Sequence, residues 1–212
     1  MCSVRFHEIY QQIIQDFKHA SVLEYAAIIS GIASVWFSRI ENILVYPVGL
    51  ISTIGYVYIS FNNHLFGEAT VNLYYTVMSI YGWVMWAKRD PQNEHVVRIT
   101  YSSAREWKQQ LLFFAAFYAV VFIALTYLKR SFYPETIPAG DAFATATAFT
   151  GMWLMARKKV ESWYWWIATN IASIPLYFVK HLPLTSLYYI VLLVMAIFGL
   201  IEWKKRTREH HA

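Results

Sequence analysis

Seven stretches of this 212-residue sequence are long and apolar enough to cross the hydrocarbon core of a membrane as helices. A crossing takes about 20 helical residues, because a backbone in lipid must satisfy its own hydrogen bonds. The stretches are 21–38, 43–61, 69–87, 109–128, 141–157, 162–179 and 184–203. Hydrophobic residues make up 58% of the chain, more than a water-soluble domain can bury. The sequence therefore predicts an all-α membrane protein with seven transmembrane helices.

Basic residues divide unequally between the two sides of the predicted membrane. Thirteen Lys and Arg residues fall on the side of the C-terminus and five on the other side. Because cytoplasmic loops are enriched in positive charge, we expect a cytoplasmic C-terminus with a basic tail over 204–212 and an outside N-terminus. The net charge of +5 then follows from topology and indicates no nucleic-acid partner. Apolar residues at helical spacing predict an amphipathic segment at the membrane interface over 1–20.

Two groups of three predicted helices look like copies of one unit. Gly31 and Gly151 lie 120 positions apart, as do Glu41 and Glu161, and Gly82-x-x-x-Trp86 recurs 117 positions later as Gly199-x-x-x-Trp203. Each unit has an odd number of crossings and one helix lies between the units, so both units point the same way. This pattern predicts parallel repeats, 21–87 and 141–203, related by a pseudo-two-fold axis along the membrane normal. Between them, 88–140 holds a loop and a linking helix that begins with a capping box of Ser103 and Glu106.

The sequence offers no catalytic or metal-binding motif. It contains no GxxxxGK[ST], GxGxxG, GxSxG or HExxH pattern, and its one cysteine, Cys2, has no partner for a metal site. Charged residues in the predicted helices lie near their ends, and they are Glu24, Arg39, Glu41, Asp141 and Glu202. Without an ionisable side chain at mid-membrane, the chain lacks a proton relay, which argues against an ion-coupled pump. We expect neither an enzyme nor a cofactor.

Polar and aromatic residues at three- and four-residue spacing form stripes on several predicted helices. They are Asn72, Tyr75, Ser79, Trp83 and Trp86 in 69–87, Trp163, Trp166, Asn170, Ser173 and Tyr177 in 162–179, and Thr145 in 141–157. An amide exposed to hydrocarbon costs several kcal/mol, so such stripes face protein or a cavity. We interpret these residues as candidates for binding a small ring-bearing solute.

Structural roles are alternatives for several of these residues. Trp86 and Trp163 stand close to lysines, where interface anchoring is common. The amide of Asn170 is of the type that joins helices in membranes. The hydroxyls of Thr145 and Ser173 are of the type that bonds back to the same helix.

Two tryptophan motifs in matching context connect the chain to a known family. They are Tyr81-Gly82-Trp83-x-x-Trp86 and Arg157-Lys158-x-Val160-Glu161-x-Trp163-x-x-Trp166-x-x-x-Asn170. With the 3+1+3 layout, they resemble the PnuC family of bacterial nicotinamide riboside transporters over about residues 24 to 203. The resemblance implies a SWEET-like fold, facilitated diffusion across the inner membrane, trapping of the solute by a cytoplasmic kinase, and a homotrimer. It carries substrate-binding roles onto the four tryptophans of the motifs and Asn170.

The expected ligand class agrees with the chemistry of these side chains. Nicotinamide riboside has a cationic pyridinium ring, which indole faces attract by roughly 0.5 to 2 kcal/mol, and Asn can pair with its carboxamide or hydroxyls. Transport of another ring-bearing vitamin, such as thiamine or riboflavin, is one alternative. A non-transporting membrane scaffold, in which the stripes only pack helices, is another.

Overall fold

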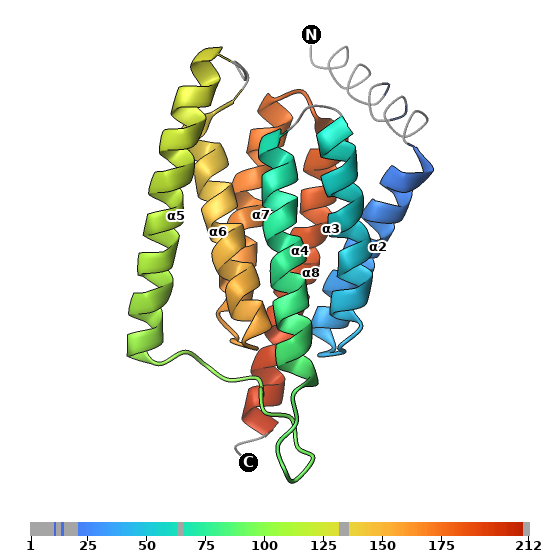
Figure 1. The fold of residues 1–212 in the computed structure, drawn as a ribbon, viewed down its shortest axis with the longest axis vertical. Coiled ribbons are helices and arrows are strands. Elements are labelled where there is room, and N and C mark those ends of the chain that lie inside the picture. Colours follow the sequence, from blue (N-terminus) through green and yellow to red (C-terminus); the bar gives the residue numbers. More distant parts are fainter. Residues whose placement is uncertain (1–10, 12–13, 15–20, 63–65, 132–135, 210–212) are drawn as a thin grey trace.

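The computed structural model describes residues 11, 14, 21–62, 66–131 and 136–209, and the predicted segment 1–20 lies outside them apart from Gln11 and Ile14. Within these residues the chain is a bundle of seven long helices (Figure 1). They are α2 (Val22–Arg39), α3 (Val45–Asn62), α4 (Phe66–Ala87), α5 (Ala104–Ser131), α6 (Pro138–Ala156), α7 (Ser162–Val179) and α8 (Pro183–Glu209). The predicted all-helical fold and the seven helices are confirmed.

The helix ends differ most from the prediction where polar residues continue a helix beyond its apolar run. α5 begins at Ala104, five residues before the predicted 109, and the predicted capping box starts it: Ser103 N donates to Glu106 Oε2 at 2.8 Å and Glu106 N to Ser103 Oγ at 3.3 Å. α8 runs on to Glu209, so the described part of the predicted basic tail is helical. A helix boundary predicted from hydropathy alone falls short of the true end where the terminal turns of the helix are polar and lie in water.

The helices pack as two groups of three (Figure 1). α3 lies between α2 and α4, and α7 lies between α6 and α8. Across the two groups α2 packs on α8 and α4 on α6, so the first helix of each group meets the third helix of the other. α5 runs along α6 at the edge of the bundle. This reciprocal arrangement supports the predicted parallel repeats.

Close contacts recur 117 positions apart in the two groups. A Cβ at Gly82 would overlap the ring of Tyr46, and one at Gly199 would overlap the ring of Trp163. Each glycine therefore lets the third helix of its group approach an aromatic ring on the second helix. Both pairs obey one offset, since 82 and 199, like 46 and 163, differ by 117.

The offset of 120 positions pairs residues in different surroundings. Glu41 occupies the turn after α2 with φ 58°, and the residue in the same place after α6 is Lys158 with φ 51°. Glu161 instead precedes the first residue of α7. Matching Glu41 with Glu161 was therefore wrong, and the turns after α2 and α6 follow the same offset of 117 as the glycine contacts.

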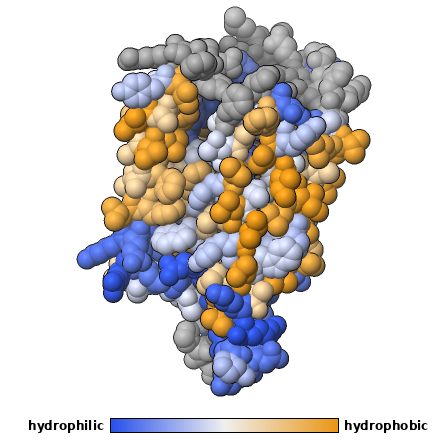
Figure 2. Space-filling view, in the orientation of Figure 1, coloured by the Kyte–Doolittle hydropathy of each residue, from blue (hydrophilic) through white to orange (hydrophobic). Residues whose placement is uncertain are grey.

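The two ends of the bundle differ in charge. One end, which we call the basic end, consists of the turns 40–44 and 157–161, the loop 88–103 and residues 204–209. Hydrophilic residues gather at that end in Figure 2, and apolar residues cover much of the visible face above it. Among the described residues, two helices, Ala104–Lys129 and Pro183–Glu209, meet a combined criterion of length, high mean hydropathy and low charge for crossing a membrane.

Candidate functional site

Five tyrosines from α3, α4, α7 and α8 come together inside the bundle, and we call them the tyrosine cluster. They are Tyr56, Tyr75, Tyr177, Tyr188 and Tyr189. The rings of Tyr177 and Tyr189 stack with centroids 5.2 Å apart, and Tyr188 meets Tyr189 edge-on at 5.8 Å. The other four tyrosines all lie near Tyr189. The cluster combines ring faces with hydroxyls, which suits a ligand that has an aromatic ring and polar groups.

One face of α7 carries four of the predicted residues into the interior. They are Trp166, Asn170, Ser173 and Tyr177, spaced three or four residues apart. The ring of Trp166 lies 6.2 Å from that of Tyr75 and packs over Gly151, where an added Cβ would be 3.3 Å from the indole. Ser173, which is buried, lies near the hydroxyl of Tyr189. The stripe on α7 therefore continues into the tyrosine cluster.

Asn170 is the buried amide of this stripe. Its side chain is only 2% exposed, and among the residues that the structure describes it takes part in no hydrogen bond. The alternative role, an amide that joins two helices, therefore has no supporting hydrogen bond in this conformation. A largely buried amide with no protein partner among the described residues is free to pair with a carboxamide or hydroxyls of a bound ligand.

α4 supplies the opposite side with Tyr75 and Ser79. Tyr75 contacts Trp166 and lies edge-on to Phe149 at 6.0 Å, and Ser79 is buried one turn further along the helix. Asn72 differs, because its Nδ2 donates to the carbonyl of Glu68 on the same helix at 3.0 Å. Of the predicted polar residues of α4, Ser79 is the one buried beside Tyr75.

Three predicted tryptophans do not join this group. Trp83 is 40% exposed on the outer surface of α4, because Gly82 rather than Trp83 faces the neighbouring helix. Trp86 and Trp163 are buried at the basic end, which excludes interface anchoring: Nε1 of Trp86 donates to the carbonyl of Met155 at 3.3 Å, and Trp163 packs edge-on to Trp203 at 5.5 Å. Their surroundings are those of packing residues.

Hydroxyls of α6 bond mainly within their own helix. Thr147 Oγ1 donates to Phe143 O at 2.8 Å, and Thr150 Oγ1 donates to Ala146 O at 2.8 Å. Thr145 is half-buried and takes part in no hydrogen bond among the described residues, so the predicted bond back to its helix is absent there. Because the hydroxyls of Thr147 and Thr150 donate to carbonyls of their own helix, α6 has few hydroxyl donors available to a ligand.

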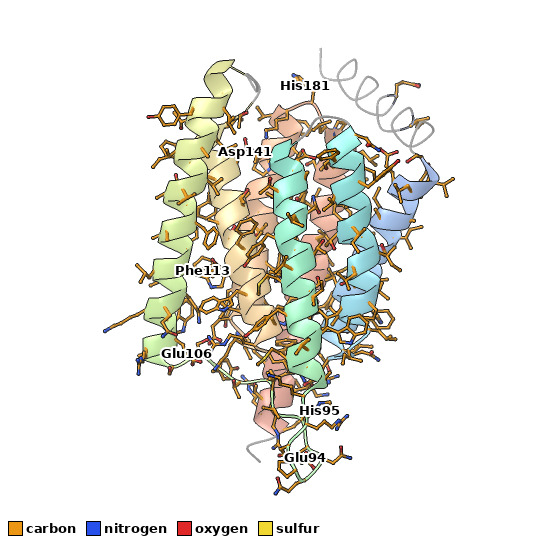
Figure 3. All side chains as sticks on the ribbon, in the orientation of Figure 1. Glu94, His95, Glu106, Phe113, Asp141 and His181 are labelled. Carbon is orange, nitrogen blue, oxygen red and sulfur yellow. The ribbon has the colours of Figure 1, made fainter. Side chains whose placement is uncertain are left out.

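Charged groups lie at the ends of the bundle (Figure 3). Asp141, at the end opposite the basic end, forms an ion pair with Lys180, while Glu94, His95 and Glu106 mark the basic end. By sequence, the helix interiors between these ends contain no Asp, Glu, His, Lys or Arg. The group around Asn170 therefore offers hydroxyls, an amide and rings, and the carboxylates that act on Tyr177, those of Glu68 and Asp141, lie at the end opposite the basic end.

Tyr188 and Tyr189 were not predicted as site residues. They lie in the second turn of α8, where a tyrosine near a span end is normally assigned to the membrane interface. Adjacent residues on a helix point in different directions, so two consecutive tyrosines cannot both lie on the same face of α8. Their adjacency is the signal that could have shown that at least one of them points into the protein. Packing between α7 and α8 turns both rings inward.

The chain matches a family model described as nicotinamide mononucleotide transporter over residues 21–205. Among curated proteins, it is 25% identical over 209 residues to the nicotinamide riboside transporter PnuC of Escherichia coli, covering 89% of this chain and 87% of that protein. It is 29% identical over 212 residues to the nicotinamide riboside transporter PnuC of Neisseria mucosa, covering 94% and 78%.

Two further similarities concern substrate range and fold. The riboflavin/roseoflavin transporter RibM of Streptomyces davaonensis is 24% identical over 183 residues, covering 85% of this chain and 83% of that protein. A crystal structure of the vitamin B3 transporter PnuC superposes with a TM-score of 0.72 at 26% identity, covering 95% of this chain and 88% of that one. The fold is therefore shared over nearly the whole chain.

Proposed function

The chain belongs to the nicotinamide mononucleotide transporter family, and from this premise we propose that it carries nicotinamide riboside across the bacterial inner membrane by facilitated diffusion. Members of this family are integral membrane transporters, so the chain is a membrane protein and not an enzyme. The relatives named for nicotinamide riboside support this substrate.

The buried, unpartnered amide of Asn170 is the observation that carries the proposal. It lies on the same face of α7 as Trp166, whose ring is close to that of Tyr75. A pyridinium cation gains about 0.5 to 2 kcal/mol beside aromatic faces. The carboxamide or the ribose hydroxyls then supply the partner that Asn170 lacks, and the hydroxyls of Ser79 and Ser173 add further polar contacts.

Facilitated diffusion follows from the chemistry of the helix interiors. Coupling to protons requires an ionisable side chain within the membrane. By sequence, the helix interiors carry no such residue. We expect the solute to move down its gradient, with rings and hydroxyls binding it weakly enough for release.

We propose that the basic end faces the cytoplasm, since 13 of the 18 Lys and Arg residues lie on that side. The domain organisation we propose is the predicted one, with units 21–87 and 141–203 on either side of 88–140. Cysteine labelling at residues 157–160 tests the orientation. Labelling of these positions from outside the cell, in a protein with no other change, would show that the basic end faces outward.

A homotrimer is the assembly that the family resemblance favours. In the structure, α5 stands at the edge of the bundle with a broad apolar surface that includes Leu112 and Tyr127. Light scattering of the purified protein in detergent measures the oligomer number. A monomer at transport-competent concentrations would contradict the trimer.

The substrate is tested by uptake into proteoliposomes loaded with purified protein. We expect saturable uptake of labelled nicotinamide riboside that equilibrates at the outside concentration and is insensitive to ionophores. Accumulation above that concentration, abolished by an ionophore, would exclude facilitated diffusion. Uptake of riboflavin in place of nicotinamide riboside would assign the chain to the function of its relative RibM.

A further inference from the structure

Hydrogen bonds tie the two groups of helices together at the basic end in a reciprocal manner. Nε1 of Trp86 on α4 donates to the carbonyl of Met155 on α6 at 3.3 Å. Nε1 of Trp203 on α8 donates to the carbonyl of Ser38 on α2 at 3.0 Å. The two donors, Trp86 and Trp203, are 117 positions apart, and so are the two acceptors, Ser38 and Met155. The hydroxyl of Ser38 also donates to Met155 Sδ at 2.9 Å. Each group thus holds the end of the first helix of the other.

Ion pairs reinforce this contact. The carboxylate of Glu41, in the turn after α2, pairs with Nζ of Lys158 at 2.7 Å and with Nη1 of Arg206 at 3.2 Å. Lys158 lies in the turn after α6, has a side chain only 4% exposed, and stands 4.6 Å from the ring centre of Trp86. A buried ammonium without its partner is strongly disfavoured. The ion pair of Glu41 and Lys158 therefore exists only while the turn after α2 and the turn after α6 are in contact.

Among the described residues, the opposite end of the bundle has no ion pair within 4 Å between the two groups. There, the pair of Asp141 and Lys180 joins α6 to the end of α7, within one group. Within 21–62, 66–131 and 136–209, every ion pair between the two groups lies at the basic end and involves Glu41. Two ion pairs and two indole hydrogen bonds therefore hold the basic end closed in this conformation.

A cavity of about 520 Å³ lies directly outside this contact. Glu41, Trp86 and Lys158 form its inner wall, and Arg89 and His95 of the loop 88–103 line it on the other side. Its volume is within the range of small-molecule sites, about 300 to 1,000 Å³. A solute that passed between the two turns would enter this cavity before it reached solvent.

We propose that Glu41, with Lys158 and Arg206, and the indoles of Trp86 and Trp203 form the gate at the basic end of the transport path. This inference rests on the proposed transport function. Opening toward the basic end separates the two turns, breaks both ion pairs of Glu41 and releases both indole hydrogen bonds. Closing restores them, while the site around Asn170 opens toward the other end.

Cysteine accessibility tests this gate without a substrate. In a Cys2→Ser background, Ser79→Cys places a thiol on α4, buried and two turns inside Trp86. A charged methanethiosulfonate reagent added from the basic end reaches this thiol only when the gate is open. We expect Glu41→Gln to raise the labelling rate about tenfold, which corresponds to a shift of about 1.4 kcal/mol in favour of the open state.

Glu94→Gln is the matched control. It also removes a carboxylate from an ion pair at the basic end, but Glu94 and Arg98 are well exposed on one loop and join no helices. We expect no change in labelling for this variant. Equal acceleration by Glu94→Gln would overturn the gate, because it would show a general effect of charge.

Trp203→Phe provides a second test that keeps an aromatic ring, although a smaller one, at this buried position. It removes the N–H donated to Ser38 O, and we expect labelling about threefold faster with an unchanged size-exclusion profile. Unchanged labelling in both folded variants would overturn the proposal. If the variants label faster but the protein transports no nicotinamide riboside, the gate is supported and the proposed substrate is wrong. If the protein takes up nicotinamide riboside but the variants label at the unaltered rate, the substrate is supported and the gate is wrong.

Discussion

Trp166 and Trp163 are three residues apart on α7, yet the two regions to which they belong are built differently. Around Trp163, at the basic end, rings pack against glycines, and the neighbouring indoles of Trp86 and Trp203 donate to backbone carbonyls. Near Trp166 lie the ring of Tyr75 and, one turn along the same face of α7, the amide of Asn170, which takes part in no hydrogen bond among the described residues. The first region is suited to holding helices together and the second to exchanging partners. The two tryptophans of one motif thus have different roles, Trp163 in packing and Trp166 in binding, and substitutions at each site can distinguish these roles.

The largest expected effect is that of Asn170→Leu on binding. Leu has a similar volume but cannot pair with a carboxamide or a hydroxyl, so a bound solute would leave a polar group unsatisfied at a cost of about 1 to 3 kcal/mol. We expect the affinity for nicotinamide riboside, measured by calorimetry, to fall about 5- to 150-fold while the melting temperature changes little.

Asn72→Leu is the control for this substitution. The amide of Asn72 already donates to the carbonyl of Glu68 on its own helix, so we expect little loss of affinity. Unchanged affinity in a well-folded Asn170→Leu variant would remove Asn170 from the site. A joint loss of stability and affinity would instead assign it to helix packing.

The packed region should respond in stability rather than affinity. Gly199→Ala places a methyl group into the ring of Trp163, and such overpacking costs typically 1 to 3 kcal/mol. We expect a lower midpoint of thermal unfolding in detergent. Gly67→Ala, at the start of α4, meets nothing within 4 Å and should be neutral or slightly stabilising. Equal midpoints for the two variants would contradict the tight packing at the basic end.

Two tryptophan substitutions sharpen the contrast on α4 and α7. Trp166→Leu removes the ring beside Tyr75, and the loss of cation–π attraction, about 0.5 to 2 kcal/mol, predicts an affinity about 2- to 30-fold lower. Trp83→Leu alters an outward-facing ring, and we expect an affinity within a factor of two of the unmodified protein. A larger loss for Trp83→Leu than for Trp166→Leu in calorimetric titrations would place the site on the outer face of α4.

The sequence predicts those features that depend on local chemistry. Apolar length locates seven helices because lipid requires it, and the capping box at Ser103 and Glu106 forms because its two bonds span three residues. The direction in which a ring points depends on neighbours distant in sequence. Trp83 and Trp86 share a motif, but Gly82 and Tyr46 decide that one faces out and the other in. For the same reason, Tyr189 was missed, since its stacking partner lies on another helix.

The smallest expected effect concerns Glu106, which fastens α5 to the turn before α7. Its carboxylate pairs with Nζ of Lys159 at 2.8 Å. The hydrogen bond from the Lys159 side chain and that from the Ser103 backbone N–H lower the pKa of Glu106 to about 2. A carboxyl whose pKa is lower in the folded state stabilises the fold above its unfolded pKa of about 4.5, and this contribution disappears as the pH falls toward 2. Since the pair lies at the water-facing end of α5, we expect less than about 1 kcal/mol. Glu106→Gln should therefore lower the unfolding midpoint clearly at pH 7 and much less at pH 2.5, whereas Glu94→Gln changes neither. A difference as large at pH 2.5 as at pH 7 would mean that Glu106 acts through the capping bond and packing rather than through its charge.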